Sequence, residues 1–417
     1  MLLLPFAHRH SLSFVDAWFT AASAGYVTGL SVVTTRTAFT PIGQGIIALL
    51  IQIGGSGITF VTTVFFLLAR RRINLHERML IAQDRNASVH GAVRLILHIL
   101  YYDLIIEGSA LLILFFHFHF VHGYPWLRAA GIATFHAISA FNNAGFDLWG
   151  NSLIGFQRDV LVILITGLLI ITGGLGFAVL TEIAEERPWS RQAKRKWSLH
   201  ARVVLQMTAI LLFVPTLIFL VREWNDIFQN LPFGYKILNA WFQSVTTRTA
   251  GFNSVDIGQL TQTSLMLMII LMFIGASPNS TGGGIKTTTF YVLVRFYAAR
   301  ITGRREVTSQ QRRLTNEDVL KAHAAFGVSL LVVLGMVFLL TWLEPNISFL
   351  RLLFEVTSAF GTVGLTTGIT PGLSTAAKLV LIVTMYLGRI GVLTFLVSIA
   401  ERPEPKAHYV KESMYIG

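Results

Sequence analysis

Four short turns in this chain each place one glycine among small and polar residues, inside regions that are otherwise apolar. Backbone carbonyls aimed at a common axis can replace the hydration shell of a cation without a charged or redox-active ligand. Glycine suits such a turn because it reaches positive φ without a steric penalty. The turn cores contain no Lys or Arg that would repel a cation, and Asp147 is their one acid. The cores are Val27–Ser31, Asn143–Asp147, Thr249–Asn253 and Thr362–Thr366.

The glycines of the four turns recur about every 110 residues, which indicates four copies of one structural unit. They are Gly29, Gly145, Gly251 and Gly364. A single turn of this kind would be a weak signal, but four copies in register favour a ring around a central axis, as in an ion-selective filter. The residues before each glycine are mostly small or polar, with Ser23, Ser139, Ser244 and Thr357 further back.

The composition places the chain in a membrane. Of its 417 residues 53% are hydrophobic and only 13% are charged, and the mean hydropathy is +0.62. A soluble domain of this length carries about a quarter charged residues. Several apolar runs also reach the ~20 residues that a helix needs to cross a bilayer. The sequence therefore predicts an all-α polytopic membrane protein.

The chain has no cysteine, which excludes disulfides, thiol nucleophiles and thiolate metal sites. Its net charge of +12 does not indicate nucleic-acid binding, because most Lys and Arg residues gather in separate loops and the C-terminal tail. Basic loops mark the cytoplasmic side of a membrane protein, so the charge mainly records topology. It also leaves room for contacts with anionic lipid or an acidic partner. The basic stretches are 70–94, 187–202, 295–321 and 402–411.

Each repeat is predicted to contain an outer helix, a short re-entrant helix and an inner helix. The repeats span residues 1–80, 81–190, 191–305 and 306–417. The re-entrant runs cover roughly three helical turns, which is too short to cross ~30 Å of hydrocarbon. Amphipathic helices lying on the outer surface are the alternative, but they do not explain why each run ends in the same glycine turn. The re-entrant segments are expected at about 13–31, 128–147, 234–253 and 348–366.

Longer apolar runs flank these segments. Outer helices are expected at about 91–120, 199–221 and 319–343, and inner segments at about 41–69, 158–181, 263–298 and 375–400. Repeat 1 has only Leu2–Ala7 where the other repeats have an outer helix. A missing N-terminal helix, caused by a late start site, is favoured over a repeat that is naturally incomplete. Glycines near the middle of the inner helices permit either close packing or a hinge.

The third inner segment contains a polar stretch, Gly275–Thr289, in the middle of a membrane span. It is not a phosphate-binding loop, because Ile285 separates the last glycine from Lys286. A broken helix whose irregular middle crosses the ion path, and so can gate it, fits the spacing. A packing irregularity filled by neighbouring helices remains the alternative. The candidate gating residues in this stretch are Gly275, Ser277, Gly282, Gly283, Gly284 and Lys286.

Arg389 lies inside the fourth inner helix. An arginine there costs at least ~2.5 kcal/mol on insertion scales and faces a partner or a water-filled cavity. Below a filter it would oppose a cation and raise the barrier to flow. A salt bridge to a buried acid, Glu107 or Glu355, is the alternative, and Lys286 can share either role. Arg248, one step before the third turn, has no partner that the sequence identifies.

The histidines do not form a convincing metal site in the sequence. His117 and His119 stand two apart on a predicted helix and point to different faces. They are interpreted as structural, together with His98, His122 and His136. No Ser–His–Asp arrangement or carboxylate pair stands out, so the chain is not expected to be an enzyme.

These motifs resemble the Trk/Ktr/HKT superfamily of potassium transporters, and most closely the membrane subunit of bacterial Ktr systems. The resemblance covers the chain from Ser13 onward and is carried by VTGLSVV, FNNAGFD, TTRTAGFN, FGTVGLTTG, SPNSTGGGIKTTT and LGRIG. It implies a multi-pass protein of the cell membrane whose filter carbonyls belong to the residues at and before each glycine. Those residues are Val27, Thr28, Gly29, Asn143, Ala144, Gly145, Thr249, Ala250, Gly251, Thr362, Val363 and Gly364.

The same resemblance implies that Gly275–Thr289 is an intramembrane gating loop and that Arg389 is the arginine below the filter. Glycine rather than serine at Gly29 favours potassium over sodium. The resemblance also implies a homodimer in the lipid membrane, on a cytoplasmic ring of nucleotide-binding regulatory subunits. No cofactor is expected on this chain and no nucleic acid as partner. Potassium is the expected substrate, and sodium is a candidate activator.

Two other functions remain open at this stage. A symporter that couples its substrate to sodium or protons would need intramembrane acids along a pathway, and the sequence has few. A non-conducting membrane sensor would carry no ion at all. Uptake of potassium through a four-repeat pore, driven mainly by the membrane potential, is the leading prediction.

Overall fold

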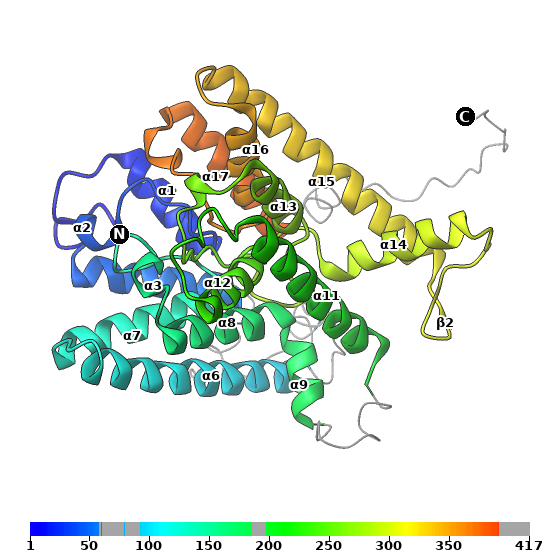
Figure 1. The fold of residues 1–417 in the computed structure, drawn as a ribbon, viewed down its shortest axis with the longest axis horizontal. Helices are drawn as coiled ribbons and strands as arrows, with labels where there is room; N and C mark the ends of the chain where they lie inside the picture. The colour runs from blue at the N-terminus through cyan, green and yellow to red at the C-terminus, as the bar shows by residue number, and fades with distance from the viewer. Residues whose placement is uncertain (58–59, 61–78, 80–91, 186–196, 392–417) are drawn as a thin grey trace.

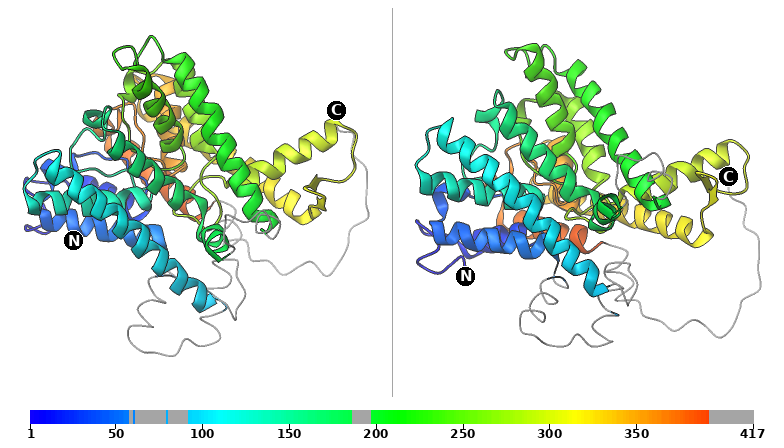
Figure 2. Two further views of the ribbon diagram at one scale, coloured as in Figure 1. Left: turned by 60° about the horizontal axis from the view of Figure 1, so that its bottom comes forward. Right: turned by 90° about the horizontal axis from the view of Figure 1, so that it is seen from below.

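The protein is described by a computed structural model over residues 1–57, 60, 79, 92–185 and 197–391. In these ranges helices are the main secondary structure, as predicted. Two short strands, β1 (Thr308–Ser309) and β2 (Arg312–Arg313), pair antiparallel in a hairpin between two helices. This hairpin region projects from the helical body in both views of Figure 2.

Four short helices occupy the predicted re-entrant segments. They are α1 (Phe14–Gly25), α7 (Trp126–Phe141), α12 (Phe233–Thr246) and α16 (Phe349–Phe360). Each has 12 to 16 residues. At 1.5 Å per residue they reach about 18–24 Å, less than the hydrocarbon thickness. Each helix runs directly into one of the glycine turns.

Three outer helices lie where the sequence predicts them. They are α6 (Ala92–Phe120), α11 (Leu199–Arg222) and α15 (Asn316–Leu343). In the described part of the chain these three are long and apolar enough to cross a membrane, and α8 with α9 adds a fourth span if the bent pair counts as one. Each outer helix packs against the re-entrant helix of its own repeat. Residues 1–13 form turns, where His8 bridges to Phe39.

The inner helices end at matching glycines. They are α3 (Pro41–Ser56), α8 (Val160–Leu175) and α17 (Thr375–Ile390). The residue after each helix is a glycine in the left-handed region, with φ of 86° at Gly57, 94° at Gly176 and 88° at Gly391. Left-handed φ favours glycine and terminates a helix.

The prediction of one continuous inner helix over 158–181 is wrong. The chain bends by 101° at Gly176 and continues as α9 (Phe177–Glu185). A Cβ at Gly176 would collide with the carbonyl of Pro278, so the bend lets the Gly275–Thr289 stretch approach the helix end. The predicted continuations of the first and fourth inner helices, to 69 and 400, lie mostly or wholly outside the described residues.

The third inner segment is broken, as predicted. Helix α13 (Gln262–Phe273) and helix α14 (Thr287–Ile301) are separated by an irregular loop over residues 274–286, the break loop. A short helical turn follows the glycine turn in each repeat. These helical turns are α2 (Thr35–Ala38), η1 (Ile154–Phe156), η2 (Ile257–Gln259) and η3 (Thr370–Gly372).

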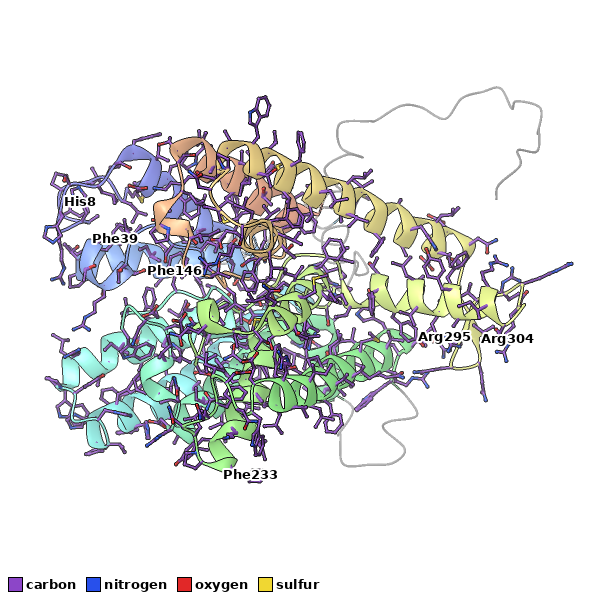
Figure 3. All side chains as sticks on the ribbon, turned by 45° about the horizontal axis from the view of Figure 1, so that its top comes forward. His8, Phe39, Phe146, Phe233, Arg295 and Arg304 are labelled. Carbon is purple, nitrogen blue, oxygen red and sulfur yellow. The ribbon has the colours of Figure 1, made fainter. Side chains whose placement is uncertain are left out.

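The four repeats close into a ring. Each inner helix packs against the re-entrant helix of the following repeat, in the pairs α3–α7, α8–α12, α13–α16 and α17–α1. A salt bridge of 2.9 Å between Lys378 of α17 and Asp16 of α1 joins the last repeat to the first. In Figure 3, His8 and Phe39 lie at one side of the molecule, and the basic residues Arg295 and Arg304 lie at the opposite side.

Candidate functional site

The four glycine turns meet at the centre of the ring. A Cβ placed on Gly29 would collide with the carbonyl of Ala144, and one on Gly145 would collide with that of Ala250. The series continues from Gly251 to Val363 and from Gly364 back to Thr28, each collision closer than 3.0 Å. Only glycine permits this approach of one backbone to the next. The turns therefore form a closed circle of backbone groups, the glycine ring.

Each turn also contains a second left-handed residue, two positions before its glycine. Its φ is 56° at Val27, 59° at Asn143, 69° at Thr249 and 48° at Thr362. Positive φ is an outlier for a β-branched residue, and three of these four are Val or Thr. Such strain persists only where the surrounding structure imposes it, and it concentrates at functional sites. The sequence analysis did not predict a left-handed residue at this second position.

Hydroxyl groups at the ends of the re-entrant helices hold the turns in place. Ser23 Oγ accepts a hydrogen bond from the amide of Gly29 at 3.1 Å, and Ser358 Oγ accepts one from Gly364 at 3.1 Å. Ser139 Oγ donates to the carbonyl of Phe146 at 2.7 Å. These bonds fix the backbone orientation on which any carbonyl ligand depends.

Two of the hydroxyl residues noted in the sequence do not serve this purpose. Ser244 donates to carbonyls of α11, and Thr357 donates to Leu353 within its own helix. Thr246 and Ser358 take the positions next to the turns instead, with Thr246 donating to the carbonyl of Phe252. Ser358 stands six residues before Gly364, the same spacing as Ser23 before Gly29. The third turn has Val245 at that position and uses Thr246, because it leaves its helix in a different register.

The candidate filter residues are shielded and uncharged. Ten of the twelve are buried, and Gly29 and Gly145 are half-buried. Asn143 lies 3.3 Å from Oγ1 of Thr249, which links the second turn to the third by side chains. The one acid of the turns, Asp147, accepts hydrogen bonds from the amides of Trp149 and Gly150. The twelve candidate filter residues therefore offer a cation only neutral groups.

The break loop lies directly against the glycine ring on its basic side. The amide of Gly283 donates to Oγ1 of Thr362 at 2.9 Å. Gly282 approaches Thr249 so closely that a Cβ would collide with its hydroxyl oxygen. The loop thus touches the first residue of the third turn and of the fourth.

The loop is also bonded to the glycine-rich ends of the neighbouring inner helices. The amides of Ser277 and Thr281 donate to the carbonyls of Gly174 and Gly173, at 3.1 and 3.2 Å. The amide of Gly284 donates to the carbonyl of Gly388 at 3.3 Å. The inner-helix glycines therefore do more than permit helix packing, since their carbonyls hold the loop.

Arg389 joins the loop to the first repeat. Its guanidinium donates to the carbonyl of Thr281 in the loop and to the carbonyls of Gly54 and Gly55 in α3. The two acids considered as its partners are engaged elsewhere. Glu355 accepts from Thr366 and Thr370, and Glu107 accepts from Asn142 at 2.9 Å.

The remaining candidate gating residues make contacts within the break loop and with the start of α14. Lys286 Nζ donates to the carbonyl of Gly282 at 2.7 Å. Ser277 Oγ accepts from the hydroxyl of Thr287 at 3.1 Å, at the start of α14. A Cβ on Gly275 would collide with the carbonyl of Gly283, so the two strands of the loop lie in contact.

Arg248 is a buried cationic residue next to the third turn. Its side chain is 6% exposed, between α8, α11 and α12. Its Nε and Nη2 have no hydrogen-bond partner in the part of the chain that the structure describes. The ion pair considered from the sequence is not formed with any described acid.

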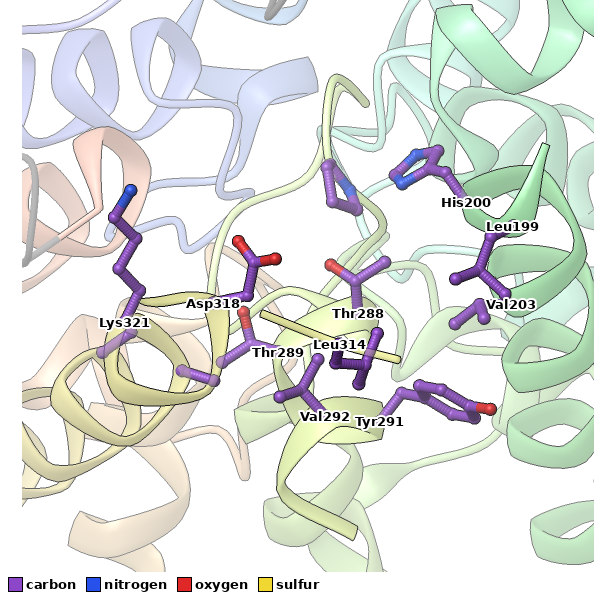
Figure 4. Close-up of a pocket in the computed structure, with 13 residues that line it drawn as sticks. Leu199, His200, Val203, Thr288, Thr289, Tyr291, Val292, Leu314, Asp318 and Lys321 are labelled. Carbon is purple, nitrogen blue, oxygen red and sulfur yellow. The ribbon is translucent and has the colours of Figure 1, made fainter. Parts of the chain in front are cut away.

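A cavity of about 580 Å³ opens on the basic side, next to the loop. Figure 4 shows it between α11, which contributes His200, and α15, which contributes Asp318 and Lys321. Thr288 of α14 lines its floor, and Pro278 of the break loop lines it as well. Whatever fills this cavity contacts the loop directly.

Comparison with known proteins decides the family. The TrkH family, described as cation transport proteins, matches residues 2–409. The chain belongs to the TrkH family of cation transport proteins. It is therefore an integral membrane protein of the cell membrane and a transporter, not an enzyme, and the resemblance seen in its motifs is confirmed.

Three relatives match this chain along its whole length. Ktr system potassium uptake protein B of Bacillus subtilis is 39% identical over 100% of this chain and 93% of its own length. Ktr system potassium uptake protein D of the same organism is 41% identical, also over 100% and 93%. Potassium/sodium uptake protein NtpJ of Enterococcus hirae is 38% identical over the same shares.

The fold has a counterpart among solved structures. The crystal structure of the potassium transporter TrkH from Vibrio parahaemolyticus superposes with a TM-score of 0.76, at 18% sequence identity. The superposition covers 94% of this chain and 79% of the TrkH chain. The predicted all-α polytopic membrane fold is thus confirmed.

Proposed function

We propose that this TrkH-family chain takes up potassium ions across the cell membrane, through a pore whose selective part is the glycine ring. The observation that carries the proposal is the closed circle of four glycines, each packed against the carbonyl that precedes the next. A ring of backbone carbonyls can replace the hydration shell of a cation. The names of the Ktr system and NtpJ relatives, all potassium uptake proteins, support potassium as the cargo.

The break loop is the gate in this proposal. It contacts Thr249 and Thr362 and is held by backbone bonds that a modest movement can exchange. Lys286 and Arg389 both donate to carbonyls of this loop. Their charges add an electrostatic barrier below the ring. Removing the loop from the axis would open the path.

The membrane potential supplies the driving force. At about 2.3 kcal/mol per charge per 100 mV, it supports substantial accumulation without ATP hydrolysis on this chain. We further propose a homodimer in the lipid bilayer, on a cytoplasmic ring of nucleotide-binding regulatory subunits. The Ktr system names of the relatives support such a complex. The cavity beside Pro278 offers a place where a partner can influence the loop.

Sodium gives the second candidate function. The relative named for potassium and sodium uptake supports a role for sodium as activator or as coupled ion. In a coupled symporter the potassium flux follows the sodium gradient. In the pore proposed here it follows the membrane potential, and sodium changes only the rate.

Growth tests the proposal most simply. A bacterium lacking its potassium uptake systems is given this chain together with its regulatory subunit, at low external potassium, with and without sodium. We expect growth to be restored. Normal expression in the membrane without restored growth would favour a non-conducting sensor and contradict the proposal.

A further inference from the structure

Three side chains with metal-binding atoms gather at one end of the second repeat. His117 lies in the last turn of α6, His122 follows that helix, and Asp159 immediately precedes α8. Nε2 of each histidine lies 2.7 Å from Oδ2 of Asp159, and the three ligand atoms are all within 4.8 Å of one another. It is the one group of three His, Cys, Asp or Glu residues with this spacing in the described ranges.

The chain turns sharply to bring the two histidines together. The amides of Val121 and His122 both donate to the carbonyl of His117, and Gly123 follows with φ of 68°. This turn folds His122 back beside His117, with their ring centroids 5.2 Å apart. His119 points elsewhere and contacts the carbonyl of Tyr124 at 2.8 Å. The sequence separated His117 from His119 correctly, but it did not reveal His122 and Asp159 as partners.

The carboxylate of Asp159 is fixed in place by its own helix. Its Oδ1 accepts a hydrogen bond from the amide of Val162 at 3.1 Å and so caps α8. Its Oδ2 remains for the histidines. In metal sites, hydrogen bonds from the outer shell fix the orientation of the ligands. The bond to Oδ1 holds the carboxylate of Asp159 in the same way.

The three side chains of the cluster are partly accessible to solvent. The exposed fraction of the side chain is 14% for His117, 14% for Asp159 and 29% for His122. Aromatic rings cover the inner side, with Phe156 5.2 Å from the His122 ring. An ion can enter from water and retain a water molecule as a fourth ligand.

We propose that His117, His122 and Asp159 bind a divalent transition-metal ion, best matched by Zn²⁺, at the outer end of the second repeat. Two imidazole nitrogens, one carboxylate oxygen and one water complete a tetrahedral zinc site. Imidazole ligands favour zinc, copper and nickel, whereas magnesium and calcium prefer oxygen ligands in larger number. Each imidazole binds the ion through Nε2 and carries its proton on Nδ1.

The site clips the outer helix to the inner helix of the same repeat. The segment between the second glycine turn and Asp159 also contacts the third turn, since Leu153 donates to the carbonyl of Asn253 at 3.0 Å. A bound ion therefore stabilises the scaffold around the ring. This inference stands on the cluster alone and does not depend on which cation the ring conducts.

Zinc binding to the full-length protein in detergent tests the inference. The protein carries a purification tag without histidine, and titration calorimetry and thermal unfolding are measured with Zn²⁺, Mg²⁺ and Ca²⁺. We expect one Zn²⁺ per chain and a higher unfolding temperature with zinc only. The absence of cysteine removes thiolate sites as a competing explanation.

Three variants assign the binding to this cluster. Asp159→Asn keeps a side-chain oxygen for the helix cap. We expect that variant and His122→Gln to weaken zinc binding at least about tenfold, because each loses a direct ligand. His119→Gln, on the same helix, is the control and should bind zinc like the natural chain. X-ray absorption of the zinc-bound natural chain should show two imidazoles and oxygen. Lack of stoichiometric zinc, equal binding by all variants, or a different ligand set would overturn the inference.

Discussion

The glycine ring and the break loop beneath it use the fourfold repeat in opposite ways. All four turns share a left-handed residue, a glycine two positions later, and a close approach to the next turn. The break loop occurs between α13 and α14, and the other inner helices end at a glycine instead. Equivalent carbonyls around an axis suit selection, whereas one asymmetric element suits a gate that opens by moving alone.

The third repeat departs from its siblings above the loop as well. In the other turns the middle residue of the triplet donates its amide to a carbonyl five residues earlier, as Thr28 does to Ser23. In the third turn Ala250 donates to Thr246, four residues earlier. The third turn, one of the two that contact the loop, thus differs from the other three in its connection to its helix. From this comparison we propose that selectivity is shared by all four repeats and that gating belongs to the third.

The largest effect is expected when a methyl group is added to one glycine of the ring. Gly251→Ala places a Cβ against the carbonyl of Val363, at a φ of 78° that disfavours alanine. We expect potassium uptake to fall at least about tenfold, since neighbouring backbone must move, and strain of this kind costs about 1–3 kcal/mol. Gly234→Ala is the matched control, because it lies in the same repeat with open space around it. Uptake assays on membranes with equal protein content compare the two.

A smaller change to the ring should alter its selectivity. Gly29→Ser keeps a small residue, but its Cβ would lie 2.5 Å from the carbonyl of Ala144. We expect sodium permeation to rise and the ratio of potassium to sodium flux to fall. Flux measurements with each ion in turn check this. An unchanged ratio would remove the first turn from the selective part of the pore.

Shortening the break loop tests the other half of the comparison. Deletion of residues 282–284 removes the contacts to Thr249 and Thr362. We expect a leakier pore, with uptake that no longer needs the regulatory subunit. Deletion of residues 310–312, in the hairpin of β1 and β2, is the control of the same length. Normal expression with unchanged or lost flux would count against gating.

Arg389 should have a smaller effect on the same gate. Arg389→Gln removes the charge that holds Thr281 in the loop. A hydrogen bond to a charged group contributes about 1.5–3 kcal/mol, so the open state should gain about tenfold or more in population. Basal flux without the regulatory subunit should rise by up to that factor. If the arginine serves only to stabilise the fold, its loss will lower the unfolding temperature and leave flux per folded protein unchanged.

The smallest effect is expected where the ring closes between its last and first repeats. Lys378→Ala breaks the salt bridge to Asp16. The side chain of Lys378 is 14% exposed and that of Asp16 is 23% exposed. A pair of this exposure contributes about 1 kcal/mol or less. The unfolding temperature should fall slightly, and more than for Lys321→Ala, which removes a largely exposed pair with Glu317. An equal fall in both would deny this contact a role in ring closure.

The sequence predicted what depends on local pattern. Apolar length located the outer and re-entrant helices, and the glycine spacing located the turns and the break in the third inner segment. The four-repeat boundaries stay a prediction. These features follow from interactions among residues close in the chain, so a single sequence carries them.

Long-range contacts could not be predicted. Nothing near Gly176 shows that Pro278 approaches it, and the expected straight helix was therefore wrong. The partners of Arg389 lie in two other repeats, which spacing alone does not reveal. The left-handed φ of Val27 or Thr249 opposes local preference and is imposed by packing. Such departures from local rules occur mainly where the ring and the loop meet.

Ion flux into vesicles tests the central claim most directly. The purified chain is reconstituted together with its regulatory subunit in liposomes with an inside-negative potential, and potassium and sodium entry are measured for the natural chain, Gly251→Ala and Gly234→Ala. The ring predicts potassium entry driven by the potential and favoured over sodium, lost in Gly251→Ala and kept in Gly234→Ala. Potassium entry that is equal in all three proteins, or that follows a sodium gradient and ignores the potential, would contradict the account.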